Sequence, residues 1–173
     1  MKILNRLFKS KGRHGTHSPF AYGFIEQVLR EPTGIKYPDS INNLIEERRL
    51  GKTFFRLIQY LDAGSLYLDE HIASKYGWLR ELGPSSTISP MGSISQEGLI
   101  LVDVQGIETY LNMFSDTELK KISFLVLHIS NKNSYFLEPF YENPNFNCTI
   151  KTWDFSLFLY KEAFKRKQHF NLR

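Results

Sequence analysis

Two continuous apolar runs, at residues 99–102 and 122–129, constrain the fold of this chain more than any other feature. Their apolar residues do not alternate with polar ones, which is typical of strands buried on both faces. A shorter apolar run at residues 66–68 is followed by a helical pattern over 70–76. Strands separated by helices of about ten residues are typical of βαβ units, so the sequence predicts a parallel sheet.

Helical patterns precede the first of these strands. Ser18 and Pro19 form a helix start that leads into apolar residues at helical spacing and ends before Pro32. A second start lies at residues 38–40, and a third helix carries apolar residues at 54, 57, 58 and 61 and stops near Gly64. We therefore expect helices over 1–62 and an α/β domain over 63–173, which together form one compact unit.

The end of the chain has a different pattern. Residues 148–153 and 155–160 are two strand-like runs set close together, and Phe170 and Leu172 alternate with polar neighbours. A helix is expected around Phe140, between the strand at 122–129 and these runs. The sequence thus predicts an α/β fold whose mainly parallel sheet has an antiparallel C-terminal edge.

The net charge of +4 is distributed unevenly along the 173 residues. Residues 1–14 hold five basic and no acidic side chains, and residues 161–173 hold five basic and one acidic. Residues 15–160 carry 12 basic and 17 acidic side chains, so the middle of the chain is acidic. This distribution does not favour a nucleic-acid groove across the fold. No apolar run approaches the roughly 20 residues of a membrane span, so we expect no membrane association.

Few residues are candidates for metal or redox chemistry. Cys148 is the single cysteine, which excludes an internal disulfide and a multi-cysteine metal site, and we expect an inert buried thiol. His14 and His17 have no carboxylate near them in sequence, so a structural role is favoured over a metal site. The first residues lack the apolar stretch of an export signal, so we expect a cytoplasmic protein.

Candidate binding residues lie where predicted strands end. Ligands of doubly wound sheets bind at the carboxyl ends of parallel strands, and Asp69 and Asp103 each follow such a strand. Their carboxylates could accept hydrogen bonds from a ribose or an amine, although a solvated or loop-capping Asp is commoner. Glu81 and Gly83 are further candidates at the start of the Gly-, Ser- and Pro-rich stretch 83–98. No G-x-G-x-x-G, P-loop or G-x-S-x-G pattern is present, and no catalytic residue is assigned.

Residues 13–20 read R-H-G-T-H-S-P-F, which resembles the start of a group of bacterial class I S-adenosylmethionine-dependent methyltransferase-like proteins. Residues 55–60 resemble the helix that leads into the first strand of that group, and residues 167–173 resemble its closing strand. The resemblance implies a Rossmann-like, three-layer α/β/α sandwich with an antiparallel closing hairpin. It also implies a cofactor site that follows the first strand.

The chain departs from that group at the cofactor site. The group's first strand runs into E-L-G-x-S-x-G, whereas this chain continues with Asp69, Glu70 and His71 and has no glycine before Gly77. Its I-D-G-x-H segment is reduced here to the single Asp103, and both acids of its later D-D pair are missing near His128. We therefore expect a degenerate methyltransferase-like protein that does not bind S-adenosylmethionine, with Tyr67, His71 and Tyr76 filling the would-be cleft.

Three functional hypotheses follow. The first is a binding or regulatory subunit that contacts a protein partner or a second copy of itself through its N-terminal residues. The second is an active methyltransferase that binds S-adenosylmethionine at an atypical site including Asp69, Glu81, Gly83 or Asp103. The third is a nucleic-acid or membrane-surface binder that uses the two basic ends of the chain.

Overall fold

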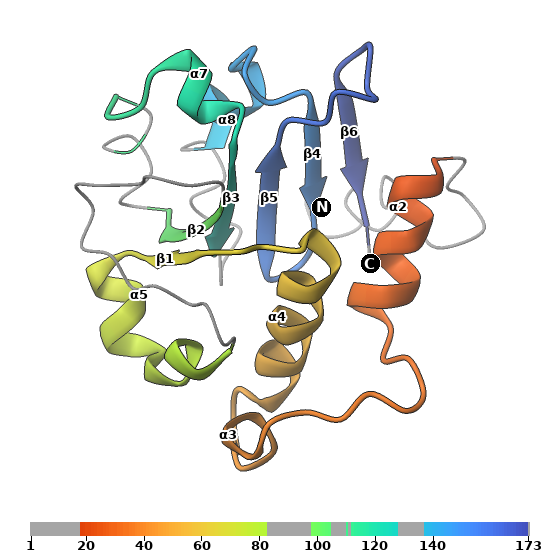
Figure 1. The fold of residues 1–173 in the computed structure, drawn as a ribbon, viewed down its shortest axis with the longest axis vertical. Coiled ribbons are helices and arrows are strands. Elements are labelled where there is room, and N and C mark those ends of the chain that lie inside the picture. The colour runs from red at the N-terminus through yellow and green to blue at the C-terminus, as the bar shows by residue number, and fades with distance from the viewer. Residues whose placement is uncertain (1–17, 83–97, 105–109, 111, 128–136, 173) are drawn as a thin grey trace, which may run out of the picture.

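The computed structural model describes residues 18–82, 98–104, 110, 112–127 and 137–172. It is an α/β fold with a six-stranded, mostly parallel sheet (Figure 1). The strands are β1 (Leu66–Leu68), β2 (Gly98–Asp103), β3 (Ile122–Leu127), β4 (Cys148–Lys151), β5 (Phe155–Leu159) and β6 (Gln168–Asn171). The helical elements before β2 are α2 (Pro19–Phe24), η2 (Ile25–Leu29), α3 (Asp39–Asn42), α4 (Arg48–Leu61), α5 (Glu70–Lys75) and η3 (Gly77–Glu81). Those after it are α7 (Asp116–Leu119) and α8 (Glu138–Glu142).

Local signals place most of these elements. Ser18 caps α2 by accepting a hydrogen bond from the Ala21 N–H, and Pro19 occupies the first turn, so the helix begins where the sequence predicts. The chain then forms the π-helical turn η2 and leaves the helix at Arg30, before Pro32. The predicted start at residues 38–40 is also confirmed, but α3 is short: it ends at Asn42, and Ile45 beyond it is 94% exposed.

The order of the strands is β1-β2-β3-β5-β4-β6. The pairs β1–β2 and β2–β3 are parallel, which confirms the prediction for residues 66–68, 99–102 and 122–127. The antiparallel edge is confirmed only in part. Strand β5 is antiparallel to both of its neighbours, but it lies between β3 and β4, and the edge strand β6 runs parallel to β4. The reason is burial: all five residues of β5 are buried, whereas β6 alternates between half-buried and exposed.

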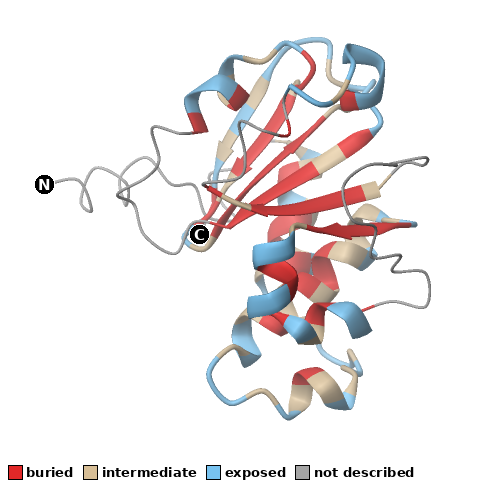
Figure 2. Ribbon diagram, turned by 90° about the vertical axis from the view of Figure 1, so that its left-hand side faces the viewer, coloured by how far each residue is buried: buried red, intermediate tan, exposed pale blue. Residues whose placement is uncertain are grey.

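Side chains of the strands pack into two hydrophobic clusters. Leu101 and Leu125 belong to one cluster, with Phe24 of α2, Phe54 of α4 and Ile72 of α5. The alternate strand residues belong to the other, with Leu119 of α7 and Phe140 of α8; they include Ile100, Val102, Phe124, Val126 and Phe158. Figure 2 shows the strands largely buried and most exposed residues on helices and connections. Because α2 and α4 pack against the strands, residues before and after position 62 share a core, and the division there stays a prediction.

The Gly-, Ser- and Pro-rich stretch 83–98 lies outside the described residues except for Gly98, which begins β2. Cys148 is buried on β4, and burial raises the pKa of its thiol to about 12. A thiol with this pKa is protonated at neutral pH and therefore a poor nucleophile, as the sequence predicts.

Within the described residues, no helix is long and apolar enough to cross a membrane.

A buried arginine joins the N-terminal helices to each other. Arg56 of α4 is 5% exposed, and its Nε donates to the Val28 carbonyl at 2.8 Å. One terminal nitrogen donates to the Tyr37 hydroxyl at 2.6 Å. The guanidinium therefore holds the end of η2 and the following connection against α4, which gives a structural reason for the arginine within residues 55–60.

We predict that Arg56→Met lowers the free energy of unfolding by about 2 kcal/mol, because it leaves the buried Val28 carbonyl and the half-buried Tyr37 hydroxyl without this donor. Arg49→Met on the same helix is the matched control. Arg49 is 83% exposed and pairs with Asp154 at 2.9 Å, so its loss should change stability by less than about 1 kcal/mol. Urea unfolding followed by circular dichroism measures both. Equal effects of the two substitutions would contradict the assigned role of Arg56.

Candidate functional site

The carboxyl ends of β1 and β2 lie beside each other. Leu68 pairs with Leu101 in the parallel register, and the N–H of Asp69 donates to the Leu101 carbonyl at 3.0 Å. Asp103, the last residue of β2, pairs with Leu127 of β3. The two candidate carboxylates therefore lie on neighbouring strands at the carboxyl ends of the sheet's parallel strands, where doubly wound folds bind ligands.

Both carboxylate oxygens of Asp69 are engaged within the protein. Asp69 is the N-cap of α5, and its Oδ1 accepts hydrogen bonds from the N–H groups of His71 at 2.8 Å and Ile72 at 3.4 Å. Its Oδ2 accepts a hydrogen bond from the hydroxyl of Tyr110. Asp69 therefore has a structural role, because its carboxylate caps the helix that follows the strand.

Tyr110 is the residue at this edge that the sequence did not single out. It lies 41 positions from Asp69 in the sequence. The ring is buried in one hydrophobic cluster, but the hydroxyl reaches Asp69. Burial raises the pKa of the Tyr110 phenol, and the hydrogen bond to Asp69 and the negative charges of Asp69 and Asp103 raise it further. The phenol is therefore a stable neutral donor.

Asp103 faces a histidine. Its Oδ2 lies 3.7 Å from Nε2 of His71, so the two side chains form an ion pair only when the imidazole is protonated. The His71 side chain is 66% exposed and that of Asp103 is 24% exposed. His71 therefore lies in solvent and does not fill a cleft, in contrast to the prediction.

The other sequence-predicted residues contribute less. Glu81 is exposed at the end of η3, and Gly83 lies outside the described residues. Tyr67 and Tyr76 are buried as predicted, but they belong to the two different hydrophobic clusters and so do not fill one common space. His14, His17 and His128 are not among the described residues, and within the described part no group of His, Cys, Asp and Glu could hold a metal ion.

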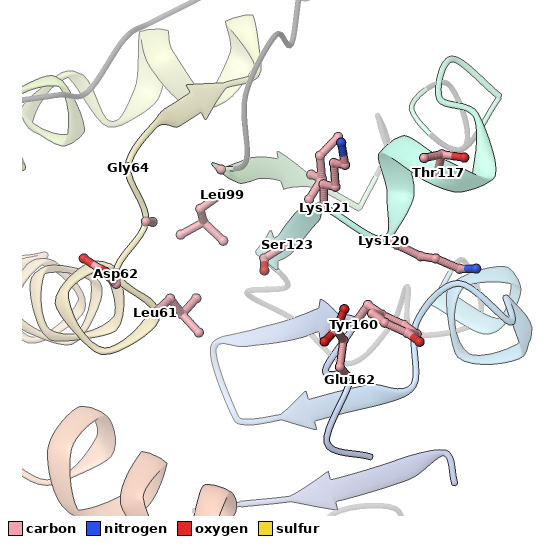
Figure 3. Close-up of a pocket in the computed structure, with 13 residues that line it drawn as sticks. Leu61, Asp62, Gly64, Leu99, Thr117, Lys120, Lys121, Ser123, Tyr160 and Glu162 are labelled. Atoms are coloured by element: carbon pink, nitrogen blue, oxygen red, sulfur yellow. The ribbon is translucent and has the colours of Figure 1, made fainter. Parts of the chain in front are cut away.

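A cavity of about 500 Å³ lies at the opposite ends of the strands (Figure 3). Its lining includes Gly98 and Leu99 at the start of β2, and Ile122 and Ser123 at the start of β3. It is therefore at the amino ends of the strands whose carboxyl ends lead to Asp69 and Asp103. No local sequence pattern indicates this cavity, because its lining comes from segments far apart in the chain.

Comparison with known proteins gives no relative from which a role could be transferred. No family model matches the chain, and no curated protein or solved structure is significantly similar to it.

We predict that Tyr110→Phe lowers the free energy of unfolding at neutral pH by about 1 kcal/mol, because Asp69 loses a donor. The substitution also changes the pH dependence. The folded-state pKa of Tyr110 lies above its unfolded value, so its stabilising contribution is complete below about pH 10 and is lost as the pH rises further.

Urea unfolding at about pH 9 and about pH 11 measures this effect, and the parent chain should lose more stability than Tyr110→Phe over that interval. The raised pKa values of Tyr60 and Cys148 act equally in both proteins and cancel in the comparison. Equal losses in the two proteins would contradict the hydrogen bond between Tyr110 and Asp69.

Proposed function

We propose that this chain is a methyltransferase-like protein without catalytic activity, which does not bind S-adenosylmethionine and acts as a binding or regulatory subunit. The observation that carries this proposal is the engagement of Asp69 at the carboxyl end of β1. The expected compartment is the cytoplasm. The proposed fold is the Rossmann-like, three-layer α/β/α sandwich of the group that residues 13–20 resemble.

Two features of the fold support the sandwich. Alternate residues of β2 and β3 enter different hydrophobic clusters, so both faces of the sheet are covered. Residues of α2, α4 and α5 contribute to one cluster and residues of α7 and α8 to the other. Helices that cover both faces of a mostly parallel sheet are the arrangement of doubly wound folds.

The turn after β1 supports the loss of cofactor binding. A nucleotide-type ligand at this edge needs free backbone N–H groups and close approach to the backbone, which glycine permits. Here the N–H groups of His71 and Ile72 donate to Asp69, and β1 is followed directly by Asp69 and the first residues of α5, Glu70 and His71, none of which is a glycine. A cofactor would have to displace a carboxylate that also accepts the Tyr110 hydroxyl.

The binding role rests on the basic ends of the chain. Residues 1–14 carry five basic side chains, and we propose that they contact a protein partner or a second copy of the chain. The exposed residues Lys165, Arg166 and Lys167 before β6 extend the basic character of the C-terminal end. Light scattering of the full chain, with and without residues 1–14, tests for self-association through this arm.

We predict that calorimetric titration of the full chain with S-adenosylmethionine and with S-adenosylhomocysteine gives no binding tighter than about 1 mM. A functional methyltransferase titrated under the same conditions is the positive control. Micromolar binding of either compound would overturn the proposal and would favour the active methyltransferase with an atypical site. Binding to nucleic acid or anionic vesicles that falls steeply with salt would favour the third hypothesis instead.

A further inference from the structure

Strand β6 is the last strand at one edge of the sheet and pairs on one side only. It runs parallel to β4, and no other strand of the described residues lies beyond it (Figure 1). The N–H groups of Gln168 and Leu172 donate to the carbonyls of Asn147 and Lys151, at 2.8 and 2.9 Å. The inner side of β6 is therefore bonded along its whole length, and its outer side faces away from the sheet.

The outer side of β6 presents the backbone groups of His169 and Asn171. Successive residues of a strand direct their N–H and C=O groups to alternate sides, so the groups of these two residues point away from β4. Both residues are exposed. Among the backbone hydrogen bonds of turns, loops and caps in the described residues, none involves His169 or Asn171. A strand edge of this kind is a template on which another extended segment can pair.

The neighbouring helices hold the faces of β6 and do not pair with its outer side. Figure 1 shows α2 beside β6, but Phe20 of α2 contacts the Tyr60 ring of α4 at 5.8 Å, so α2 packs on the face that α4 covers. Phe170 packs against the hydrophobic cluster of that face. From α8, the Tyr141 ring lies 6.0 Å from the His169 ring. These contacts fix which side chains point to each face, and thereby the register that an added strand would meet.

The sequence of β6 contains none of the residues that usually block an edge. Natural edge strands carry lysine, inward-pointing charges or proline, which prevent pairing with another chain. Strand β6 reads Gln-His-Phe-Asn and has neither lysine nor proline. It is only four residues long, so an added strand gains few backbone hydrogen bonds. Specific binding therefore needs a second attraction beside the strand.

Basic side chains provide that attraction at the amino end of β6. Residues 165–167 read Lys-Arg-Lys and are all exposed. Partial burial lowers the pKa of His169, the charge of Lys167 lowers it further, and Glu142 acts in the opposite direction. Glu162 lies further back, at the cavity beside the amino ends of β2 and β3. The three basic residues thus outnumber the acidic group beside them, and this end of the edge is positive.

We propose that the outer edge of β6 binds an extended acidic segment of a partner protein, which adds a strand to the sheet. The backbone of the segment pairs with His169 and Asn171, and its acidic side chains lie beside residues 165–167. A second copy of this chain fits the edge poorly, because residues 165–173 hold no acidic side chain to face residues 165–167. The inference rests on the proposed binding role and adds to it a surface and a class of partner.

The test titrates the full chain with synthetic peptides of about ten residues while the amide signals of His169 and Asn171 are followed by NMR. The peptides alternate Thr and Val, which favour an extended backbone, and carry a run of Glu at either the amino or the carboxyl end. Peptides with Lys in place of Glu are the matched controls. We expect at least one Glu peptide to bind at low salt with a Kd of about 0.1 mM, roughly tenfold more tightly than its Lys control. The end that carries the Glu run in the tighter peptide gives the direction of the added strand.

Substitutions separate the backbone contribution from the charge contribution. Asn171→Pro removes an outward N–H, which an edge strand tolerates, and should weaken binding of the Glu peptide roughly tenfold. Asn171→Ala removes only the side chain and is the matched control, with an expected change of less than about twofold. Lys165→Gln and Arg166→Gln should each weaken binding roughly threefold, the effect of one exposed charge pair. Lys36→Gln removes an exposed charge before α3 and should leave the Kd unchanged.

Three results would overturn the inference. The first is that no Glu peptide shifts the signals of His169 and Asn171, and the second is that the Lys peptides bind as tightly as the Glu peptides. The third is a concentration-dependent dimer of the chain that Asn171→Pro abolishes, because the edge would then bind a second copy. Circular dichroism identifies any variant that does not fold. A Glu peptide with a fully N-methylated backbone keeps its charges but donates no backbone hydrogen bond, so its binding should be lost in the parent chain itself.

These outcomes are distinct from those of the cofactor titration. Binding of S-adenosylmethionine at the carboxyl ends of β1 and β2 would overturn the proposed loss of cofactor binding without moving the signals of β6. Conversely, failure of every peptide to bind leaves the cofactor result unchanged and removes only the role of this edge.

Discussion

Leu101 and Leu125 pack into one hydrophobic cluster, while their neighbours Val102 and Val126 pack into the other. Each of these four side chains is at most 1% exposed, and full burial of one such side chain contributes about 1.5–3 kcal/mol. Burial on both faces leaves no polar side chain along the middle of β2, and only Ser123 near the start of β3. Polar groups that could contact a ligand are therefore confined to the two ends of these strands.

The two ends differ in how their charges are used. At the carboxyl ends, Asp69 accepts hydrogen bonds from α5 and from Tyr110, so its carboxylate is a structural element. At the amino ends, the charged side chains of Asp62 and Lys121 lie on opposite sides of a cavity. A sheet of this kind is expected to bind at its carboxyl ends, yet in this chain both oxygens of the Asp69 carboxylate at that end already accept hydrogen bonds within the protein.

The strands and most helices could be predicted because apolar spacing is a local signal. The position of β5 could not, because strand order depends on contacts between distant residues such as Phe124 and Phe158, which face each other across β3 and β5. A local clue existed: residues 155–159 form a nearly continuous apolar run, as expected of an inner strand, whereas residues 168–171 alternate, as expected of an edge. The cavity could not be predicted, because Asp62, Lys121 and Glu162 are ordinary surface charges until folding places them together.

Asp69 could be found from its position after a strand, but its role depended on Tyr110, which no motif connects to it. A ligand that used the N–H groups of α5 would lose the Asp69 cap and free the Tyr110 hydroxyl. Each of these contacts contributes about 1 kcal/mol, so their combined loss would weaken binding roughly thirtyfold. A ligand in the cavity at the amino ends of β2 and β3 meets no such penalty, because no internal hydrogen bond of Asp69 or Tyr110 has to break before it binds. The internal contacts at the carboxyl ends of the strands thus favour ligand binding at their amino ends.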